Sequence, residues 1–374
     1  DLHTVASGGG SRLFYKNGLF VVGPESSGAD PGPLCYGRDG YSSITDANLV
    51  TGRLDPESFP KIFGPNGDAP LNIEASRKGF ETIAEALGKS IEAVAEGFLD
   101  VANEQMANAI REVTLKKGFD PASHILCAFG GAGGQHAVAV ARKLGIKKVL
   151  VHRYAGILSA YGMALAKRSF EAIRHVGLPL DTCKEALFEP LQKQIASKLP
   201  DQGEVRWQRL VRLRYEGTDA TIEVPFEHAK AAFEERYERE FGFLMQERPL
   251  IAESIRMIAE IVAPGWSRQT IAPASEPLKP LRMHRLYARG HWLDAPVYDM
   301  EELGGGAVIK GPALVMQSTS TIVLEPGCRA EISPYGDLVI DVPAEEGRKE
   351  TGIEAALDAL FSNRFHFIAT RMGD

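Results

Sequence analysis

The chain has 374 residues, of which 44% are hydrophobic and 24% are charged, and its formal net charge at pH 7 is −7. This length is enough for two or three globular domains with a sizeable core, and the composition is ordinary for such domains. The acidic balance and the absence of any Lys/Arg block argue against a nucleic-acid-binding surface. No apolar run approaches the roughly 18 residues that a membrane-spanning helix needs.

The four cysteines are far apart in the sequence, and none forms a C-x-x-C pair. This spacing gives no support to a zinc site or a redox pair, so no metal ligand is assigned from the residues alone. We interpret all four as reduced thiols, which are typical of a cytoplasmic protein. Cys127 lies in an apolar run and is expected in the core, whereas Cys35 lies in a loop.

The first elements expected are a β-hairpin and a long loop. Residues 12–22 form the hairpin, because the central Asn17-Gly18 pair tolerates the positive φ angles of a tight turn. Residues 23–40 have no periodicity and contain five glycines and three prolines. Because bulky side chains stand at 34–36 within this loop, we expect it to be ordered and buried rather than disordered.

Helices and then a regular β–loop–α–β unit are expected to follow. The helices cover 45–50, 76–87 and 90–117, and Gly118 ends the last of them. The unit contains, in order, a strand at 124–129, a glycine turn at 130–134, a helix at 135–144 and a strand at 147–152, with a further helix at 156–166. Because a helix connects the two strands, they should be parallel with a right-handed crossover.

Beyond residue 174 the pattern changes, and from about residue 277 short strands and Gly/Pro turns dominate. Pro190 is expected to break or kink the first helix of this part. The expected elements are helices at 184–199 and 229–241, a hairpin at 210–224 around Gly217, a strand at 255–262, a β-rich region at 277–342, a charged linker at 345–349 and a new helix at 352–361.

The turn at 130–134 is the first candidate for ligand contact. A glycine run after a strand lets backbone N–H groups approach a phosphate or a nucleoside closely, and the start of the following helix favours anions. The turn lacks the Lys-Ser/Thr of a P-loop, and His136 stands where a G-x-G-x-x-G motif has its last glycine. Tight packing without a ligand therefore remains an alternative. His136 could contact a ligand or act as a general acid or base, or it could simply hydrogen-bond the loop.

The loop at 23–40 and the helix after it form the second candidate segment. Asp30, which Pro31 holds extended, could use a buried carboxylate to bind a substrate or a cation, or it could cap backbone amides. Asp46 lies at a helix start, where capping is the expected role. Asn103 and Glu104 lie in the middle of a helix and are expected on the surface or in contacts between helices.

Several long runs of unusual residues resemble the hydantoinase A/oxoprolinase family. They cover residues 22–37, 45–50, 52–56, 101–106 and 109–111, and residues 286–342 look like the later β-rich part of the same family. Within the family, residues 129–137 resemble the 5-oxoprolinase version of the glycine loop. Gly134-Gln135 stands where hydantoinase A and acetone carboxylase subunits more usually carry proline.

This resemblance implies an α/β fold that is part of an actin-like ATPase, of the ribonuclease H type, followed by a smaller β-rich domain. It implies ATP-dependent hydrolysis of 5-oxo-L-proline to L-glutamate, with cleavage of ATP to ADP and phosphate and a requirement for Mg²⁺. The nucleotide would be contacted by the backbone of Gly130, Gly131, Gly133 and Gly134, and residues 7–11 would lie toward the interdomain cleft. The candidates on the substrate side are Asp30, Tyr36, Asp46, Asn48 and His136.

The resemblance also divides the chain and suggests partners. We expect an actin-like ATPase part at 1–175, an α+β segment at 176–276, a small β-rich domain at 277–345, and a linker with the start of the next region at 346–374. The family's two phosphate loops are not visible and there is no initiator Met. We therefore expect an internal fragment that is inactive alone and that works with a hydantoinase B-like region of the same chain. We expect the protein to be a cytoplasmic homo-oligomer. Its partner should be a small-molecule substrate, and we expect no nucleic-acid or membrane partner.

Two rival functions stay open. One is an ATP-dependent hydantoinase or acetone carboxylase-type subunit, against which Gly134-Gln135 argues. The other is a noncatalytic scaffold subunit that keeps the fold without ATP chemistry. The missing phosphate loops are the only support for the scaffold, and truncation explains them more simply.

Overall fold

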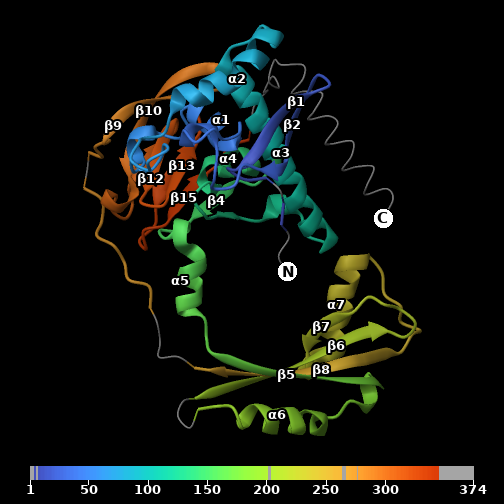
Figure 1. The fold of residues 1–374 in the computed structure, drawn as a ribbon. Coiled ribbons are helices and arrows are strands. Elements are labelled where there is room, and N and C mark those ends of the chain that lie inside the picture. Colours follow the sequence, from blue (N-terminus) through green and yellow to red (C-terminus); the bar gives the residue numbers. More distant parts are fainter. Residues whose placement is uncertain (1–3, 6, 201–203, 263–266, 276, 345–374) are drawn as a thin grey trace. The chain divides into compact units, whose positions relative to one another are not determined.

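The computed structural model describes residues 4–5, 7–200, 204–262, 267–275 and 277–344 (Figure 1). Contacts group these residues into two compact units, and each unit is described by itself. The first unit holds the described residues of Asp1–Leu115, Asp120–Tyr161 and Gln269–Asp374. The second unit holds those of Lys116–Phe119 and Gly162–Arg268.

The first unit begins with a β-hairpin that packs against helices. The hairpin predicted around Asn17-Gly18 is confirmed, with φ angles of 52° and 80° at these two residues. Phe20 of the hairpin stacks on Phe98 with ring centroids 4.2 Å apart, so the apolar side chains of the hairpin are buried against a helix. The elements are β1 Ser11–Lys16, β2 Leu19–Ser26, η1 Leu34–Tyr36, α1 Ile44–Val50, η2 Pro56–Ser58, α2 Ile73–Leu87, α3 Ile91–Lys116 and η3 Pro121–Ser123.

A five-stranded sheet in the order β11-β14-β15-β4-β3 forms the centre of the first unit. Its strands are β3 Leu126–Ala128, β4 Lys148–Val151, β11 Val308–Lys310, β14 Arg329–Ile332 and β15 Leu338–Asp341. β3 and β4 are parallel, as predicted, and α4 Gly133–Lys143 connects them. β15 pairs with β4, so the late β-rich segment completes a sheet that starts near residue 126. This pairing differs from the separate domain that we expect at 277–345.

A second sheet of the first unit has the order β13-β12-β10-β9. Its strands are β9 Arg282–Ala288, β10 His291–Asp299, β12 Ala313–Gln317 and β13 Ser320–Leu324, with η8 Met300–Glu302 after β10. Ile322 and Leu324 of β13 belong to the same buried cluster as Val138 of α4 and Val149 of β4. α4 therefore lies in a core shared by both sheets, and its position depends on both.

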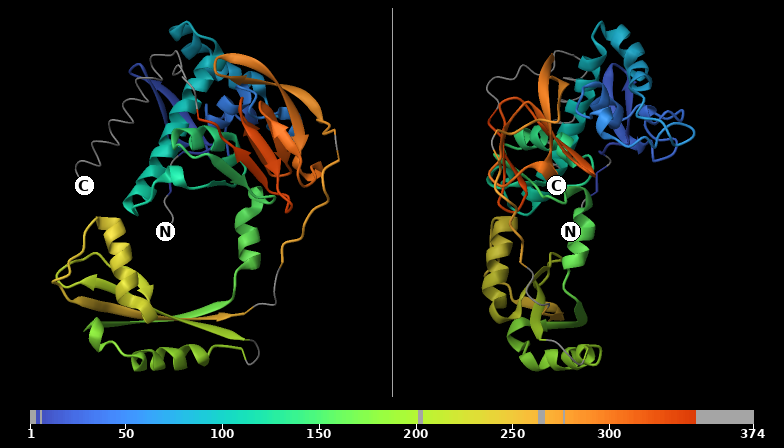
Figure 2. Two further views of the ribbon diagram at one scale, coloured as in Figure 1. Left: turned by 180° about the vertical axis from the view of Figure 1, so that it is seen from behind. Right: turned by 90° about the vertical axis from the view of Figure 1, so that its left-hand side faces the viewer.

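The second unit is an antiparallel sheet in the order β5-β8-β6-β7. The hairpin predicted at 210–224 and the helix predicted at 229–241 are confirmed. Figure 2 shows this sheet with its helices α6 and α7, and the buried side chains of both helices belong to one cluster with the sheet. The elements are β5 Ser169–Pro179, η5 Leu180–Thr182, η6 Glu185–Phe188, α6 Glu189–Ala196, β6 Val205–Tyr215, β7 Ile222–Pro225, η7 Phe226–His228, α7 Ala229–Phe241 and β8 Leu250–Ile261.

Two helix predictions need adjustment at their starts. The helix expected at 184–199 is an α-helix only from Glu189, because Pro190 occupies its first turn, where no backbone N–H is needed. The helix expected at 156–166 is preceded by a 3-10 turn. It comprises η4 Ala155–Ile157 and α5 Leu158–Leu165.

One burial prediction is wrong, and some predictions fall outside the described residues. Cys127 was expected in the core but is exposed, because β3 is the edge strand of its sheet. The linker expected at 345–349 and the helix expected at 352–361 lie outside the described residues. None of the helices in the described part of the chain combines the length and the apolar character that crossing a bilayer would require.

Candidate functional site

An apolar cavity of about 540 Å³ lies beside the glycine loop of the first unit. Its walls come from α3, from β3 and the loop after it, and from α4. The lining apolar side chains are Val5, Met106, Ala109, Ile110, Val113, Leu126, Ala128, Phe129, Ala132, Ala137 and Val140. Such walls can bury a flat, mostly apolar group, and the volume lies within the range of small-molecule pockets.

Three of the four glycines assigned to nucleotide contact have clearly different surroundings. Gly133 lines the cavity, and a Cβ added to it would meet nothing within 4 Å. A Cβ at Gly134 would lie 2.6 Å from the Thr321 backbone oxygen and 3.0 Å from the Ile322 Cα, so this glycine lets α4 approach β13. Gly130 has a φ of 83° and donates its N–H to the Ala155 oxygen at 2.8 Å. Tight packing, one of the two alternatives left open by the sequence, is therefore confirmed at Gly134, whereas the space at Gly133 leaves ligand contact there a prediction.

A second glycine run reaches the same cavity. Ser7 and Gly8 are among its lining residues. The backbone N–H and the hydroxyl of Thr45 both donate to the Gly9 oxygen at 2.9 Å, which fixes this run against the start of α1. A Cβ at Gly9 would lie 3.9 Å from the Ala132 Cβ, so the two glycine runs meet. No local pattern in the sequence indicates this meeting, because the two runs are more than a hundred residues apart.

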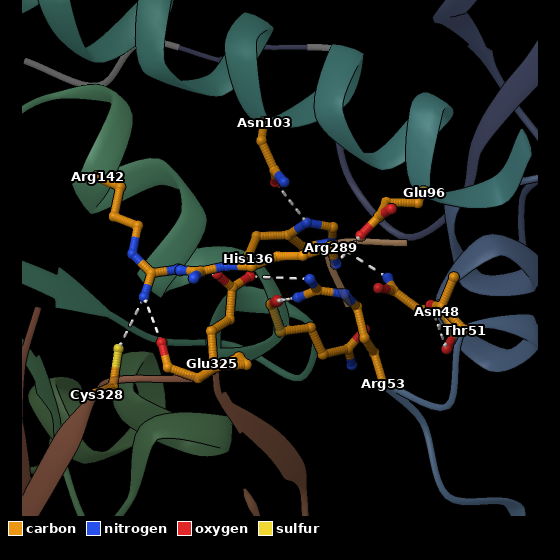
Figure 3. A network of polar contacts seen from close by, with 12 residues as sticks. Asn48, Thr51, Arg53, Glu96, Asn103, His136, Arg142, Arg289, Glu325 and Cys328 are labelled. Carbon is orange, nitrogen blue, oxygen red and sulfur yellow. Dashed lines mark hydrogen bonds and ion pairs between the residues drawn. The ribbon is translucent and has the colours of Figure 1, made fainter. Parts of the chain in front are cut away.

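His136 connects the cavity to a buried polar network, shown in Figure 3. Its Nδ1 lies 2.9 Å from Oδ1 of Asn103 on α3, and its Nε2 lies 3.3 Å from Nδ2 of Asn48 on α1. This pairing requires a neutral imidazole that donates from Nδ1 and accepts at Nε2. Burial, together with the nearby Arg53 guanidinium, lowers the pKa of His136 to about 3, although Glu325 opposes the shift. His136 therefore bonds two helices and not the loop.

The side chain of Asn48 has a polar atom without a hydrogen-bond partner among the described residues. Its side chain is fully buried, and its Oδ1 has no hydrogen-bond partner. Asn48 and His136 were both candidates from the sequence, and the structure brings them together with Asn103, for which only a surface or inter-helix role was expected. The contact between Asn103 and His136 confirms the inter-helix alternative.

A cluster of charged residues lies behind His136. Arg53 donates to Glu325 Oε1 at 2.8 Å and to the Gln135 oxygen at 3.2 Å, while Arg142 donates to the other oxygen of Glu325. Arg142 also lies 3.4 Å from the Cys328 sulfur, and burial raises the pKa of that thiol to about 11 despite the guanidinium. The sequence did not single out these charged residues, because they are brought together only by the fold.

Two further carboxylates of α3 make buried contacts. Glu104 is fully buried and pairs with Lys143 of α4 and with Arg111, each at 3.0 Å. Burial alone would raise the pKa of Glu104, but these two cations outweigh it and lower that pKa. The surface alternative for Glu104 is wrong and the inter-helix alternative is confirmed. Glu96 accepts the backbone N–H groups of Arg289 and Gly290 at 2.7 and 3.2 Å, which fixes the β9–β10 turn.

The remaining substrate-side candidates do not line this cavity. Asp46 is fully buried, and its capping role is confirmed: it forms a capping box with Ser43 and accepts bonds from Cys35 N at 2.8 Å and Ser76 Oγ at 2.7 Å. Tyr36 is half-buried with its ring 4.7 Å from that of Phe63, and burial raises its pKa. Asp30 is exposed, so the expectation of a buried carboxylate there is wrong. Among the described residues, no group of three His, Cys, Asp or Glu side chains could hold a metal ion.

Comparisons with known proteins agree on one family. The Hydantoinase/oxoprolinase family model matches residues 1–172, and the model of the Hydantoinase/oxoprolinase C-terminal domain matches residues 180–336. The whole chain is 40% identical to 5-oxoprolinase of Dictyostelium discoideum and 40% identical to 5-oxoprolinase 1 of Arabidopsis thaliana. It spans 32% of the length of each of these relatives.

Two solved structures have the same fold. ATP-dependent caprolactamase from Pseudomonas jessenii matches with a TM-score of 0.75 and 25% identity, covering 90% of this chain and 52% of that one. A nucleotide-free structure of acetone carboxylase matches with a TM-score of 0.69 and 23% identity over 90% of this chain and 52% of that one. The expected α/β fold of the actin-like ATPase type is thereby confirmed. With both domains of the family matched along its length, the chain belongs to the hydantoinase/oxoprolinase family.

Proposed function

We propose that the chain is part of an ATP-dependent 5-oxoprolinase and that its apolar cavity holds the nucleoside part of ATP. The family and the 40% identity to two proteins named 5-oxoprolinase support the reaction. The observation that supports the nucleotide site is the open space at Gly133, where the glycine loop borders the cavity. A ligand in the cavity could touch the loop backbone there without meeting a side chain.

The arrangement suits a nucleoside that continues into phosphates. Apolar walls from α3 and α4 would bury the faces of a base, which stabilises binding through removal of apolar surface from water. α4 begins at Gly133, and the free N–H groups of a helix start favour an anion. The meeting of the two glycine runs at Gly9 and Ala132 would narrow the space beside the bound group.

The proposed reaction opens a stable amide. ATP would transfer its terminal phosphoryl group to the amide oxygen of 5-oxoproline, which makes the carbonyl carbon reactive toward water. Water would then add, the ring C–N bond would break with a proton going to nitrogen, and phosphate would leave, giving glutamate. Within the described residues we propose only positioning and exclusion of water for this chain. No cluster there fits Mg²⁺, so no step is assigned to the metal.

We propose that His136 is a neutral wall of the cavity and not an acid or base. Both of its nitrogen atoms are used by Asn103 and Asn48, and its pKa of about 3 keeps it uncharged near neutral pH. Asp30, Tyr36, Asp46 and Asn48 remain predictions for the substrate side. The inactivity of this chain alone, the hydantoinase B-like partner region and a cytoplasmic homo-oligomer are likewise proposals.

A second candidate function is hydrolysis of another lactam. The alpha subunit of caprolactamase from Pseudomonas jessenii is 28% identical over 89% of this chain, and the chain spans 51% of that relative. A cyclic amide without the carboxylate of 5-oxoproline would use the same phosphoryl transfer. The identity to proteins named 5-oxoprolinase is higher, so we keep 5-oxoproline as the first substrate.

The reaction can be tested by measuring ADP release by the intact protein with and without 5-oxoproline. We expect 5-oxoproline to stimulate ADP release, with glutamate formed alongside. Stimulation by caprolactam, a hydantoin or acetone instead would keep ATP use but exclude the proposed substrate. No ATP turnover with any of these compounds would favour the scaffold, and turnover by this chain alone would contradict its proposed inactivity.

A further inference from the structure

A second cavity, of about 630 Å³, lies in the first unit at the carboxyl end of β4. It is lined by residues from the turn after β4, from η8 and from the turns of two hairpins. Its lining also includes Ile271 to Pro273, in the segment before β9. In sheets with parallel strands, ligands commonly bind outside the carboxyl ends of those strands. No role for this cavity follows from the proposed nucleotide site.

Backbone contacts fix the walls of the second cavity. Ile271 donates its N–H to the Pro334 oxygen at 2.9 Å, and Ala274 donates to the Gly305 oxygen at 2.9 Å. A Cβ at Gly304 would lie 2.5 Å from the Ala274 Cα, and a Cβ at Gly156 would lie 1.8 Å from the Thr319 hydroxyl oxygen. Because glycines permit both close approaches, the walls are held in place without a ligand, as in a preformed pocket.

A cation is held at this cavity without a carboxylate partner. The backbone N–H of Arg153 donates to Oδ1 of the buried Asp337 at 3.1 Å. The backbone oxygen of Arg153 accepts a hydrogen bond from Gln317 Nε2 at 3.1 Å. The Arg153 guanidinium carbon lies 5.1 Å from the ring centre of Tyr154. Among the described residues no carboxylate forms an ion pair with this guanidinium. Two side chains of separate hairpins thus fix the backbone of Arg153, and its exposed side chain leaves the positive charge available.

Two carboxylates that form no ion pair with a described residue line another wall of the same cavity. Glu301 and Glu302 of η8 are exposed, and in the described part of the chain neither side chain forms an ion pair. Apolar side chains of Ile157, Ile271 and Met300 also line the cavity. Among the described residues, the preformed cavity is therefore lined by a positive group, by negative groups that form no ion pair with it, and by apolar side chains.

We propose that this cavity binds a small zwitterion, either a free amino acid with an apolar side chain or a short apolar peptide. Its carboxylate pairs with Arg153 and its ammonium group pairs with Glu301 and Glu302. The apolar side chain contacts Ile157, Ile271 and Met300. Amino acid and peptide share these charges and differ in length, and the cavity volume admits both. This proposal does not rest on the proposed ATP-dependent reaction.

The test is calorimetric titration of the intact protein with four probes, namely L-leucine, leucyl-leucine, N-acetyl-leucine and leucine methyl ester. We expect leucine or leucyl-leucine to bind. The one that binds more tightly shows whether the ligand is a free amino acid or a short peptide. The N-acetyl form, which lacks the ammonium group, and the ester, which lacks the carboxylate, should each bind about fivefold more weakly, as befits ion pairs at exposed side chains.

Matched variants assign each charge. Arg153→Gln should weaken leucine binding about fivefold and abolish its advantage over the methyl ester. The double variant Glu301→Gln/Glu302→Gln should abolish the advantage of leucine over N-acetyl-leucine. Arg329→Gln is the control, because Arg329 is an exposed arginine that pairs with Glu331 at 3.0 Å and does not line the cavity.

Three outcomes would overturn the proposal. They are binding of none of the four probes, zwitterion binding that Arg153→Gln leaves unchanged, and zwitterion binding that is lost in Gly133→Val, which would place the ligand in the cavity beside the glycine loop. Binding of an ATP analogue, measured on the same samples, reports on the proposed function separately. Failure of one proposal can therefore be distinguished from failure of the other.

Discussion

The apolar cavity beside the glycine loop and the charged cluster behind it are built in opposite ways. The cavity is lined by small and apolar residues and is left open, whereas Arg53, Arg142 and Glu325 are buried and paired with one another. His136 is linked to both regions, since it lines the cavity and the charges of Arg53 and Glu325 act on its pKa. Under the proposed function, the cavity provides space for a ligand and the cluster holds the walls of that space in position.

Removal of Glu325 should have the largest effect on stability. Glu325→Gln leaves two buried guanidinium groups without their shared carboxylate, and breaking a buried ion pair costs about 3–5 kcal/mol. Urea denaturation of the variant and of the parent measures this loss. Glu331→Gln is the matched control, because its pair with Arg329 is exposed and should contribute at most about 1 kcal/mol. Equal losses in the two variants would remove the distinction between cluster and surface.

Alanine substitutions at two adjacent glycines should differ in stability, because one glycine is tightly packed and the other faces open space. Gly134→Ala places a Cβ against the backbone of β13 and should lower the free energy of unfolding by about 2 kcal/mol. Gly133→Ala meets nothing within 4 Å, so it should change stability by less than about 1 kcal/mol and can even stabilise the helix start. The measurement is again urea denaturation. The packing account of Gly134 fails if the two alanine variants are equally stable.

The buried state of His136 should appear as a pH dependence of stability. Its pKa in the folded chain is about 3, below the ordinary value of 6.5, so the unfolded chain binds more protons between these values. The contribution of neutral His136 is therefore complete above pH 6.5 and is lost as the pH falls toward 3. Between pH 7 and pH 5.5 the parent should lose about 1 kcal/mol more than His136→Gln. Parallel losses in both proteins would show that His136 is not held neutral.

Local sequence signals predicted the N-terminal hairpin and the β–loop–α–β unit beside the cavity well, but they did not predict the charged cluster. Asn17-Gly18 predicted its hairpin, and the glycine turn between two short apolar runs predicted the parallel β3 and β4. The side chains of Arg53 and Glu325 are 272 positions apart in the chain, and no pattern of neighbouring residues announces such a pair. Cys127 was misplaced for the same reason, because only strand order shows that β3 is an edge.

For the candidate residues too, local roles could be predicted from the sequence and long-range contacts could not. Asp46 follows Ser43 by three positions, which is the spacing of a capping box, so its structural role could be predicted. Asn48 and His136 were chosen separately, and their contact with each other and with Asn103 depends on the packing of three helices. A single sequence therefore indicates which residues carry polar groups but not which of them meet.

The central claim is that a nucleotide occupies the cavity at Gly133. The most direct measurement is the affinity of the intact protein for a non-hydrolysable ATP analogue, compared with that of Gly133→Val, in which a larger side chain is added at the cavity wall. The account predicts that affinity falls by about tenfold or more, a loss of about 1.4 kcal/mol, while thermal stability stays near that of the parent. Unchanged affinity in a folded Gly133→Val protein would contradict it and would place the nucleotide elsewhere.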